Sequence, residues 1–206
     1  MVAYVFGESG DLGKALISKL TQDGHLVKAL SRQDIIAMIS SEFRSHDFND
    51  LTQVYFAIGQ FTPGALVKVD SELIESEIQA NLVLPILLCK GILESSDSNG
   101  SIRRDFVFIG STSSYAGFAD SASYCAAKHG LVGFVKSMND EYKESETRFW
   151  LASMGTMQGK MSRKILGQDS STFLDPYLVA SEIVQRTTAV GNLFEPEILI
   201  RRRIVK

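Results

Sequence analysis

Two side chains suited to acid–base chemistry, Tyr124 and Lys128, stand four residues apart in a helical pattern. That spacing places both on one face of an α-helix. A phenol ionises near pH 10, and an ammonium about 4 Å away would favour its ionised form by roughly 4 kcal/mol at an effective dielectric near 20. The pair is therefore a candidate proton donor that works near neutrality. The alternative is an ordinary pair of surface residues, and the surrounding sequence has to distinguish the two interpretations.

A hydroxyl group follows an apolar run upstream of this pair. The run at residues 105–110 has the pattern of a buried strand, and Ser111 comes directly after it. Ligands of parallel α/β sheets bind at the carboxyl ends of the strands, so we expect Ser111 to face the ligand crevice. Ser113 is a competing hydroxyl two residues later.

The N-terminal residues have the pattern of a strand, a glycine turn and a helix. Residues 2–6 are apolar, glycines follow at positions 7, 10 and 13, and a helical pattern begins near residue 11. Glycine permits positive φ and a close approach of the backbone to a pyrophosphate, which a helix N-terminus also favours. The alternative is a tight turn that only reverses the chain, and the motif downstream makes that alternative the weaker one.

The elements that must position these residues alternate along the chain. We expect strands near 2–6, 26–30, 44–47, 52–57, 104–110, 148–153 and 197–201, and helices near 11–23, 33–42, 71–94, 121–145 and 176–189. Such alternation is typical of the α/β class, as a Rossmann-like doubly wound parallel sheet with helices on both faces. The length fits one dinucleotide-binding catalytic domain over residues 1–206.

The order of the glycine turn, Asn81, Ser111, Tyr124 and Lys128 resembles that of the short-chain dehydrogenase/reductase family. The resemblance covers nearly the whole chain. Its strongest block, residues 108–131, has no gap and looks like the catalytic serine loop and Tyr-x-x-x-Lys helix of that family. A second block over 57–85 resembles the strand end and helix that carry an Asn-Asn-Ala-Gly motif, although both asparagines of that motif are absent here.

The resemblance implies a role for each of four residues. Tyr124 is the expected general acid in reduction, Lys128 lowers its pKa and contacts the nicotinamide ribose, Ser111 polarises the carbonyl, and Asn81 completes the tetrad. Pro85 supports Asn81, because proline has no N–H for the Asn81 carbonyl, which is left free to hold a water. The alternative is that Pro85 only kinks a buried helix.

Cofactor choice depends on the end of the second strand. Ser31 and Arg32 stand about twenty residues after the glycine turn. A carboxylate at this position would bind the ribose diol of NAD(H). The guanidinium of Arg32 instead suits the 2′-phosphate of NADP(H). The sequence therefore favours NADP(H) over NAD(H), although Glu8 and Asp11 place opposing negative charge in the glycine turn.

Further cofactor contacts follow from the resemblance. Asp47 and Phe48 match its acidic–hydrophobic pair at the adenine, although Asp47 alternatively caps a turn. The residues expected to bind the dinucleotide are Gly7, Ser9, Gly10, Leu12, Gly13, Ser31, Arg32, Asp47, Phe48, Ala57, Ile58, Gly59, Tyr124, Lys128, Gly155 and Thr156.

The chain also departs from the family pattern. Only residues 49–51 separate Phe48 from the next strand, so the helix usual there is expected to be missing. Met154 replaces the proline of a Pro-Gly pair, and Thr156 is the nearest candidate for the nicotinamide amide. The segment at about 155–176 is the expected substrate loop or lid. Its methionines suit apolar ligands, and its basic residues suit either an anionic substrate or a solvated lid.

Composition argues against several other classes of protein. A net charge of −3 gives no reason to expect a nucleic-acid partner, and the basic residues at 201–203 are best interpreted as a solvated strand end. The chain has no long apolar run and no leader pattern, so we expect no membrane partner and a cytoplasmic location. Two cysteines and three histidines suggest no disulfide framework and no metal site.

The resulting hypothesis is an NADPH-dependent reductase of a small ketone or aldehyde, with Tyr124 as general acid. The resemblance also implies a homodimer or homotetramer formed through the helices near 71–94 and 121–145. One alternative is a non-catalytic dinucleotide-binding sensor or partner-binding protein. Another is a sugar epimerase or dehydratase, which the glycine spacing at 7, 10 and 13 suggests.

Overall fold

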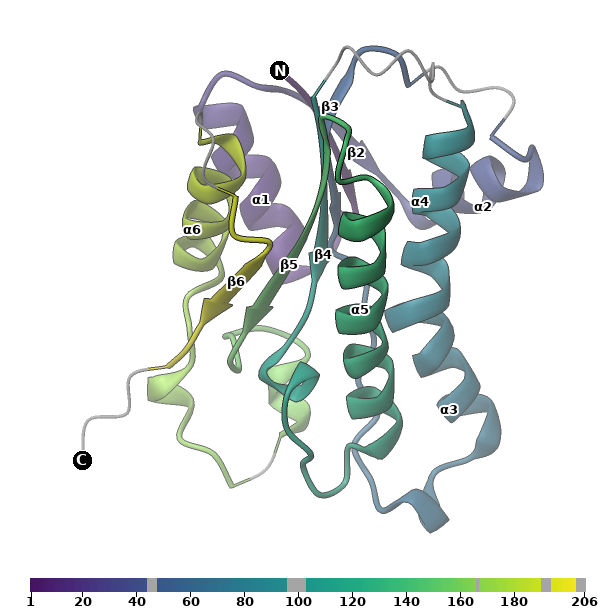
Figure 1. Cartoon of the computed structure of the whole chain (residues 1–206). Coiled ribbons are helices and arrows are strands. Elements are labelled where there is room, and N and C mark those ends of the chain that lie inside the picture. Colours follow the sequence, from purple (N-terminus) through teal and green to yellow (C-terminus); the bar gives the residue numbers. More distant parts are fainter. Residues whose placement is uncertain (44–47, 96–102, 166, 190–193, 203–206) are drawn as a thin grey trace.

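The protein, described here from a computed structural model, contains one six-stranded parallel sheet with helices on both faces (Figure 1). The structure describes residues 1–43, 48–95, 103–165, 167–189 and 194–202. The strand order is β2-β1-β3-β4-β5-β6, and all pairs are parallel. The strands are β1 (Val2–Phe6), β2 (Leu26–Leu30), β3 (Leu51–Phe56), β4 (Arg104–Ile109), β5 (Thr147–Met154) and β6 (Glu197–Ile200). The predicted α/β doubly wound fold is confirmed.

Two groups of helices cover the two faces of the sheet (Figure 1). The helices are α1 (Asp11–Gln22), α2 (Arg32–Ser40), α3 (Ser71–Ile78), α4 (Leu84–Ser95), α5 (Ala122–Glu141) and α6 (Pro176–Thr188). Apolar residues of α1 and α6 fill one core, and those of α2, α4 and α5 fill the other. Every strand therefore ends at a single edge of the sheet, the carboxyl edge, between two helical layers.

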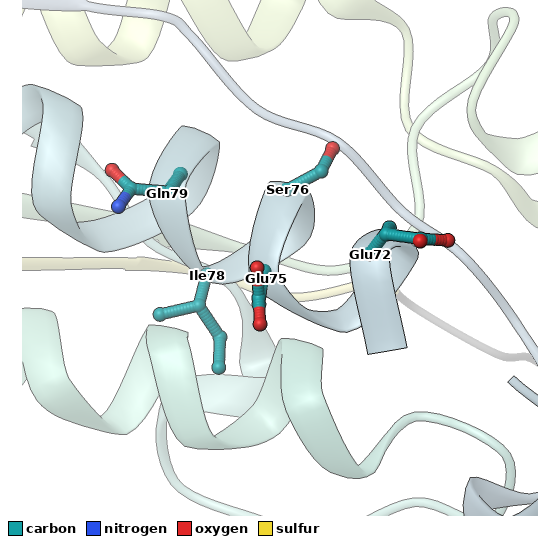
Figure 2. A pocket seen from close by; sticks show the side chains of 5 residues that line it. All are labelled: Glu72, Glu75, Ser76, Ile78 and Gln79. Carbon is teal, nitrogen blue, oxygen red and sulfur yellow. The ribbon is translucent and has the colours of Figure 1, made fainter. Parts of the chain in front are cut away.

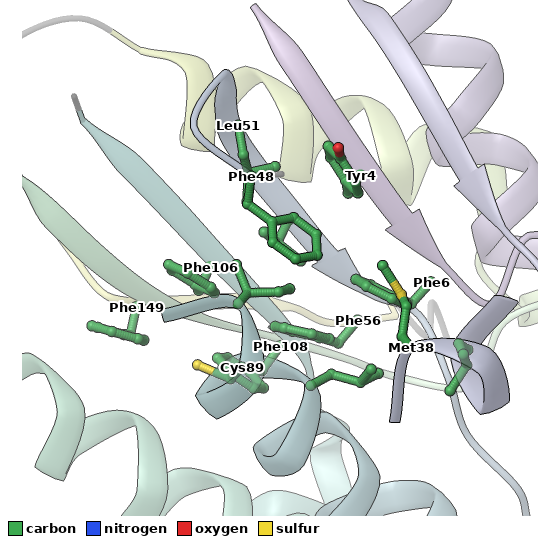
Figure 3. Close-up of a cluster of buried hydrophobic side chains, with 14 of the residues drawn as sticks. Tyr4, Phe6, Met38, Phe48, Leu51, Phe56, Cys89, Phe106, Phe108 and Phe149 are labelled. Carbon is green, nitrogen blue, oxygen red and sulfur yellow. The ribbon is translucent and has the colours of Figure 1, made fainter. Parts of the chain in front are cut away.

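Stacked phenylalanines on neighbouring strands fill the core that lies between the sheet and helices α2, α4 and α5. Phe6 and Phe56 are register partners on β1 and β3 with ring centroids 5.5 Å apart, and Phe56 stacks on Phe108 of β4 at 4.6 Å (Figure 3). Phe106 stacks on Phe149 of β5 at 5.3 Å. Each such pair adds about 0.5–1.5 kcal/mol beyond area burial. The aromatic ladder fixes the central strands and, with them, the positions of their carboxyl ends.

The predicted long helix at 71–94 is interrupted by a π-helical turn. Residues Gln79–Val83 form this turn between α3 and α4, and the N–H of Leu84 donates to the carbonyl of Gln79. Pro85 follows, and because proline lacks an N–H it cannot continue the regular ladder. The combined helix Ser71–Ser95 is the one described helix that is long and apolar enough to cross a membrane, by length and composition alone. Here Leu88, Cys89 and Ile92 of its α4 part are buried in the core against the sheet.

The predicted bounds of the described elements differ from the observed ones by at most two residues, except at the end of α5, which was predicted at 145 and is observed at Glu141. The predicted strand at 44–47 lies outside the described residues. Between α2, which ends at Ser40, and β3, which begins at Leu51, the described residues contain no helix, as expected. Among the described strands β2 pairs with β1 alone, so it forms an edge of the sheet, and Leu26 on it is 61% exposed.

Candidate active site

The carboxyl edge brings three of the predicted catalytic residues together. Tyr124 and Lys128 lie one turn apart near the start of α5, and the Nζ atom of Lys128 is 5.5 Å from the Tyr124 ring centroid. The same Nζ donates to the carbonyl of Ile109 at 2.8 Å, where β4 ends. Ser111, which follows β4, lies close enough to Tyr124 for its hydroxyl to lower the pKa of the phenol. The predicted hydroxyl, phenol and ammonium groups therefore meet at one end of the sheet.

Ser111 rather than Ser113 faces this cluster. Ser111 is the N-cap of a short 3₁₀ helix at Thr112–Ser114, and its Oγ accepts the N–H of Ser113 at 3.1 Å. Ser111 is partly exposed, whereas Ser113 is buried. The cap explains why a serine suits this position, since its hydroxyl satisfies an otherwise unpaired backbone N–H.

The pKa of Tyr124 is raised in this structure, and its predicted lowering by Lys128 stays a prediction. Burial raises the pKa of Tyr124 to about 12, the neighbouring Ser111 hydroxyl acts to lower it, and the nearby Glu77 and Cys125 raise it further. Burial also lowers the pKa of Lys128 to about 8, against the raising effect of Glu77. The ammonium group is directed at the Ile109 carbonyl, so desolvation outweighs its attraction for a phenolate. The phenol of Tyr124 is accordingly protonated at pH 7.

Asn81 lies inside the π-helical turn and is fully buried. Its Nδ2 atom donates to the carbonyls of Gln60 at 2.6 Å and Glu77 at 2.8 Å. Its Oδ1 atom has no hydrogen-bond partner, and a Cβ atom built on Gly59 would lie 3.0 Å from it. Asn81 therefore fastens α3 to the segment after β3. Its predicted water-holding role stays a prediction.

Glu77 is the residue of this cluster that sequence reasoning missed. It is fully buried, four residues before Asn81 on the same helical face. Its carboxylate accepts the N–H of Thr62 at 2.6 Å and the hydroxyl of Ser123 at 2.5 Å. The available signal was its spacing from Asn81, since the two positions share one side of a helix.

A phenylalanine and the predicted lid enclose the cluster. Phe61 is buried and packs edge-on against Tyr124 with centroids 5.2 Å apart. The Nζ atom of Lys164, from the loop at 155–176, donates to the Phe61 carbonyl at 2.8 Å. One basic residue of that loop, Lys164, therefore makes a hydrogen bond inside the protein. In Figure 1 the loop, in light green, lies below the carboxyl ends of β4 and β5.

The glycine turn has the shape that a dinucleotide pyrophosphate needs. Gly7 has φ of +93°, and a Cβ atom there would lie 2.6 Å from the carbonyl oxygen of Ala57. A Cβ atom on Gly13 would lie 2.1 Å from the carbonyl oxygen of Gly7, so neither position accepts a side chain. The N-cap of α1, Gly10, supplies no side-chain cap for the first N–H groups. These groups and the helix dipole suit a phosphate, so the residues present fit the group.

Asp11 connects this turn to the lid. Its carboxylate, in the first turn of α1, accepts the N–H of Lys160 at 2.7 Å. Nearby, the methyl carbon of Met161 is 3.9 Å from the position that a Cβ on Gly59 would occupy. The lid therefore rests on both the glycine turn and the end of β3, where a dinucleotide is expected to lie.

A carboxylate stands at the end of β2, where the sequence had suggested none. Ser31 and Asp34 form a capping box at the start of α2, in which Asp34 accepts the N–H of Ser31 at 2.8 Å and its hydroxyl at 2.6 Å. The signal was the Ser-x-x-Asp pattern, which is typical of helix starts. Arg32 lies exposed between these two residues. Both a cation and an anion are thus available to a ribose at this position.

The predicted adenine contact of Phe48 is contradicted. Phe48 is fully buried and packs on Tyr4 with centroids 5.5 Å apart. It precedes β3, so it lies at the amino edge of the sheet, opposite the glycine turn. The connection from Phe48 to β3 is short, so Phe48 lies just before the first residue of that strand, Leu51. Its neighbour Asp47 lies outside the described residues.

The remaining predicted contacts line the strand ends. The N–H of Ala57 bonds the carbonyl of Phe6 at 2.9 Å, which places the segment after β3 beside the glycine turn. After β5, the N–H of Gly155 bonds the carbonyl of Ile200 at 2.9 Å, and the Thr156 hydroxyl donates to Gln168. Thr156 thereby points within the lid, and its predicted contact with the nicotinamide stays a prediction.

A separate surface hollow of about 470 Å³ contains none of these residues. Figure 2 shows its lining side chains, which all belong to α3 and the π-helical turn: Glu72, Glu75, Ser76, Ile78 and Gln79. In the part of the chain that the structure describes, no group of three or more His, Cys, Asp or Glu side chains is arranged to hold a metal.

Comparison with known proteins agrees with this geometry. The short chain dehydrogenase family model matches residues 56–169, more than half of the chain. Carbonyl reductase family member 4 of Xenopus tropicalis is 28% identical over 215 residues, covering 89% of each chain. A 4-hydroxyisoleucine dehydrogenase mutant complexed with NADH and succinate has a TM-score of 0.84 at 18% identity, covering 98% of this chain and 97% of that chain.

A second solved structure, ElxO with NADP bound, has a TM-score of 0.82 at 15% identity, covering 97% of this chain and 96% of that chain. At these identities the two structures support the fold alone, whereas the matched family model extends from the end of β3 through Tyr124 and Lys128 into the lid. The chain belongs to the short-chain dehydrogenase family, a family of NAD(P)-dependent oxidoreductases.

Proposed function

We propose that this protein is an NADPH-dependent reductase of small ketones or aldehydes, with Tyr124 as its general acid. The observation that carries the proposal is the convergence of Ser111, Tyr124 and Lys128 at the carboxyl edge, to which Asn81 is connected through Glu77. The carbonyl reductase relative supports the class of substrate. General acid catalysis of this kind contributes about 10²–10⁴-fold to a rate.

The residues of the chain divide the work as follows. A bound reduced nicotinamide would supply the hydride. The Ser111 hydroxyl donates to the substrate oxygen and orients it, and Tyr124 donates its phenolic proton to that oxygen. The raised pKa of Tyr124 keeps the phenol protonated across the neutral range. Lys128, whose pKa is about 8, is mostly protonated at pH 7 and contacts the ribose.

For the cofactor, Arg32 is the proposed reader of the 2′-phosphate of NADPH, because a guanidinium matches phosphate geometry. Asp34 beside it opposes the same phosphate, so the preference is a balance between two neighbouring charges. The solved relatives hold either form, since one is complexed with NADH and another has NADP bound.

The first experiment is a calorimetric titration of the purified protein with NADPH and then with NADH. We expect binding of NADPH to be the tighter. A screen of small ketones and aldehydes with NADPH then follows, with Tyr124→Phe as the control that binds dinucleotide and lacks turnover. Absence of binding to both dinucleotides, or equal turnover by the Tyr124→Phe variant, contradicts the proposal.

A non-catalytic dinucleotide-binding protein is the second candidate. The observation that favours it is the enclosure of the site, because Phe61 covers Tyr124 and the lid bonds Asp11 in the glycine turn. Tight dinucleotide binding without turnover of any carbonyl in the screen is the outcome that selects it.

The proposal includes a homodimer or homotetramer in the cytoplasm. Leu73 on α3 and Leu87 on α4 are 42% and 43% exposed, on the helices that would pair. Light scattering during gel filtration gives the mass directly, and a Leu73→Glu/Leu87→Glu double variant is expected to reduce it to that of one chain. A monomeric wild-type protein contradicts this part.

A further inference from the structure

Three glutamates on α3 have very different surroundings. Glu72 and Glu75 are exposed, and they line the surface hollow of Figure 2. Glu77 is completely buried. Burying a carboxylate is costly unless hydrogen bonds or opposite charges compensate, so a buried glutamate requires an explanation.

Hydrogen bonds from two separate segments compensate for the burial of Glu77. One oxygen accepts the backbone N–H of Thr62 at 2.6 Å, and the other accepts the hydroxyl of Ser123 at 2.5 Å. Because each oxygen serves as an acceptor, the contacts suit the ionised form. In the described part of the chain no ion pair involving Glu77 is recorded. Its charge therefore acts on the site around it without a bonded cation to neutralise it.

The two donors flank Tyr124. Ser123 directly precedes Tyr124 in the first turn of α5, where the N-cap Ser121 makes no side-chain cap bond. Thr62 follows Phe61, whose ring packs edge-on against Tyr124. Glu77 thus fastens both the helix start that carries the phenol and the aromatic side chain that covers it.

The ionisable groups on which the charge of Glu77 acts are those of the proposed chemistry, Tyr124 and Lys128 of α5. Cys125 of the same helix and the Ser111 hydroxyl at the end of β4 also lie near Tyr124. The charge of Glu77 raises the pKa of both Tyr124 and Lys128. It therefore favours the protonated form of each.

We propose that Glu77 is a positioning residue of this site, which holds the first turn of α5 through Ser123 and supplies the buried negative charge that faces Tyr124 and Lys128. This inference rests on the proposed reductase function and deepens it. Asn81 bonds the backbone carbonyl of Glu77, so both residues lie in one connected network.

The charge is tested by the titration of Lys128, which needs neither substrate nor dinucleotide. The ¹³Cε resonance of Lys128, assigned by its loss in Lys128→Met, is followed against pH in wild type, Glu77→Gln and the matched surface control Glu75→Gln. We expect a midpoint near the pKa of about 8 in wild type and in the control. In Glu77→Gln we expect it to fall by on the order of 1 pH unit, the effect of a charge several ångströms away.

An unchanged Lys128 midpoint in folded Glu77→Gln overturns the proposal. Ser123→Ala is the second variant, because it removes one hydrogen bond and keeps the charge. We expect its kcat to fall by about tenfold, the effect of roughly one lost hydrogen bond to a charged group, with KM nearly unchanged. A wild-type kcat in Ser123→Ala also overturns it. If wild type reduces no carbonyl, the reductase function fails, while the titration still decides whether Glu77 acts on Lys128.

Discussion

The two edges of the sheet differ in whether a buried charged group has partners of opposite charge. At the amino edge, the carboxylate of Asp105 accepts bonds from Arg103 at 3.2 Å, Arg148 at 2.6 Å and the Trp150 indole at 2.7 Å. At the carboxyl edge, the described partner of the buried Lys128 ammonium is a backbone carbonyl, and Oδ1 of Asn81 has no partner.

The pKa values follow the same contrast. Burial raises the pKa of Asp105 to about 6, although Trp150 and Arg103 counteract it. Burial lowers the pKa of Lys128 to about 8, and only the charge of Glu77 counteracts it. The amino edge uses charges to join strands, whereas the carboxyl edge keeps a charge that destabilises the fold and is available for chemistry. Nε of Arg104 at the amino edge also lacks a partner, for which we have no account.

The largest expected effect tests the carboxyl edge. Tyr124→Phe removes the proton donor and keeps the ring that packs on Phe61, so kcat should fall by about 10²–10⁴-fold. Calorimetry should give an NADPH Kd within about twofold of wild type, because the ring of residue 124 is kept. A tenfold change in Kd would correspond to about 1.4 kcal/mol of binding free energy. A large loss of NADPH binding in this variant would mean that Tyr124 serves the cofactor rather than the acid step.

At the amino edge, Asp105→Ala should lower the free energy of unfolding by about 3 kcal/mol, since removing one partner of a buried ion pair leaves the other unpaired. The value is at the lower end of the range because Arg103 and Arg148 retain some solvent exposure. Denaturant unfolding measures it. Activity per folded molecule should remain that of wild type, and a loss of kcat would break the contrast between the edges.

Lys128→Met should have the opposite effect on stability. Lys128 is 3% exposed, and its pKa falls from 10.5 to about 8 on folding. At pH 7 the buried charge therefore costs roughly 3 kcal/mol, at about 1.36 kcal/mol per unit. The unfolded state binds more protons than the folded state between pH 8 and 10.5, so this cost disappears as pH rises through that window.

The variant should thus unfold at higher denaturant than wild type at pH 7, and the difference should close above pH 10. Denaturant unfolding curves of both proteins at pH 7, 9 and 10.5 test the sign of this stability difference. A variant that is less stable at pH 7 would show that the bond to Ile109 outweighs the burial of the charge.

Smaller effects are expected at the end of β2. Arg32→Ala should weaken NADPH binding by about tenfold, since a hydrogen bond to a charged group contributes about 1.5–3 kcal/mol and this one is exposed. NADH binding should be nearly unchanged. The neighbouring variant Asp34→Asn should shift the ratio toward NADPH. Equal losses for both dinucleotides in Arg32→Ala would remove Arg32 as the phosphate reader.

The smallest expected effect is at the glycine turn. Asp11→Asn removes a negative charge from the first turn of α1, where a pyrophosphate is expected, and weakens the bond to Lys160. Affinity for both dinucleotides should rise by a few fold, because a charge at a helix end contributes about 0.3–1 kcal/mol. Weaker binding instead would show that this contact shapes the site for the ligand.

Local patterns predicted most of the fold and the centre of the site. The spacing of Tyr124 and Lys128 on one helical face and the place of Ser111 after a strand follow from periods of 3.6 and 2, which the sequence displays directly. The interruption near Asn81 was also foreseeable, because Pro85 lacks an N–H. Burial is not local, however. The desolvation of Tyr124, which reverses its expected pKa shift, depends on Phe61, far away in the chain.

The remaining errors have equally specific causes. Phe48 was assigned by its position after an expected strand, but it is buried and lies just before β3, at the amino edge of the sheet. Glu77 resembles the exposed glutamates of the same helix, and only its contacts with Thr62 and Ser123 separate it from them. Residue type and spacing identify groups that can react, whereas the charges that tune them depend on tertiary packing.

The edge strand β2 links cofactor choice to local order. It is five residues long, pairs on one side within the described sheet, and is largely exposed along its length. Segments with few buried contacts open with low free energy, so amide exchange should be faster here than in β3 or β4. Ser31 and Arg32 are attached to its end. A dinucleotide bound by these residues would therefore also stabilise the strand against local opening.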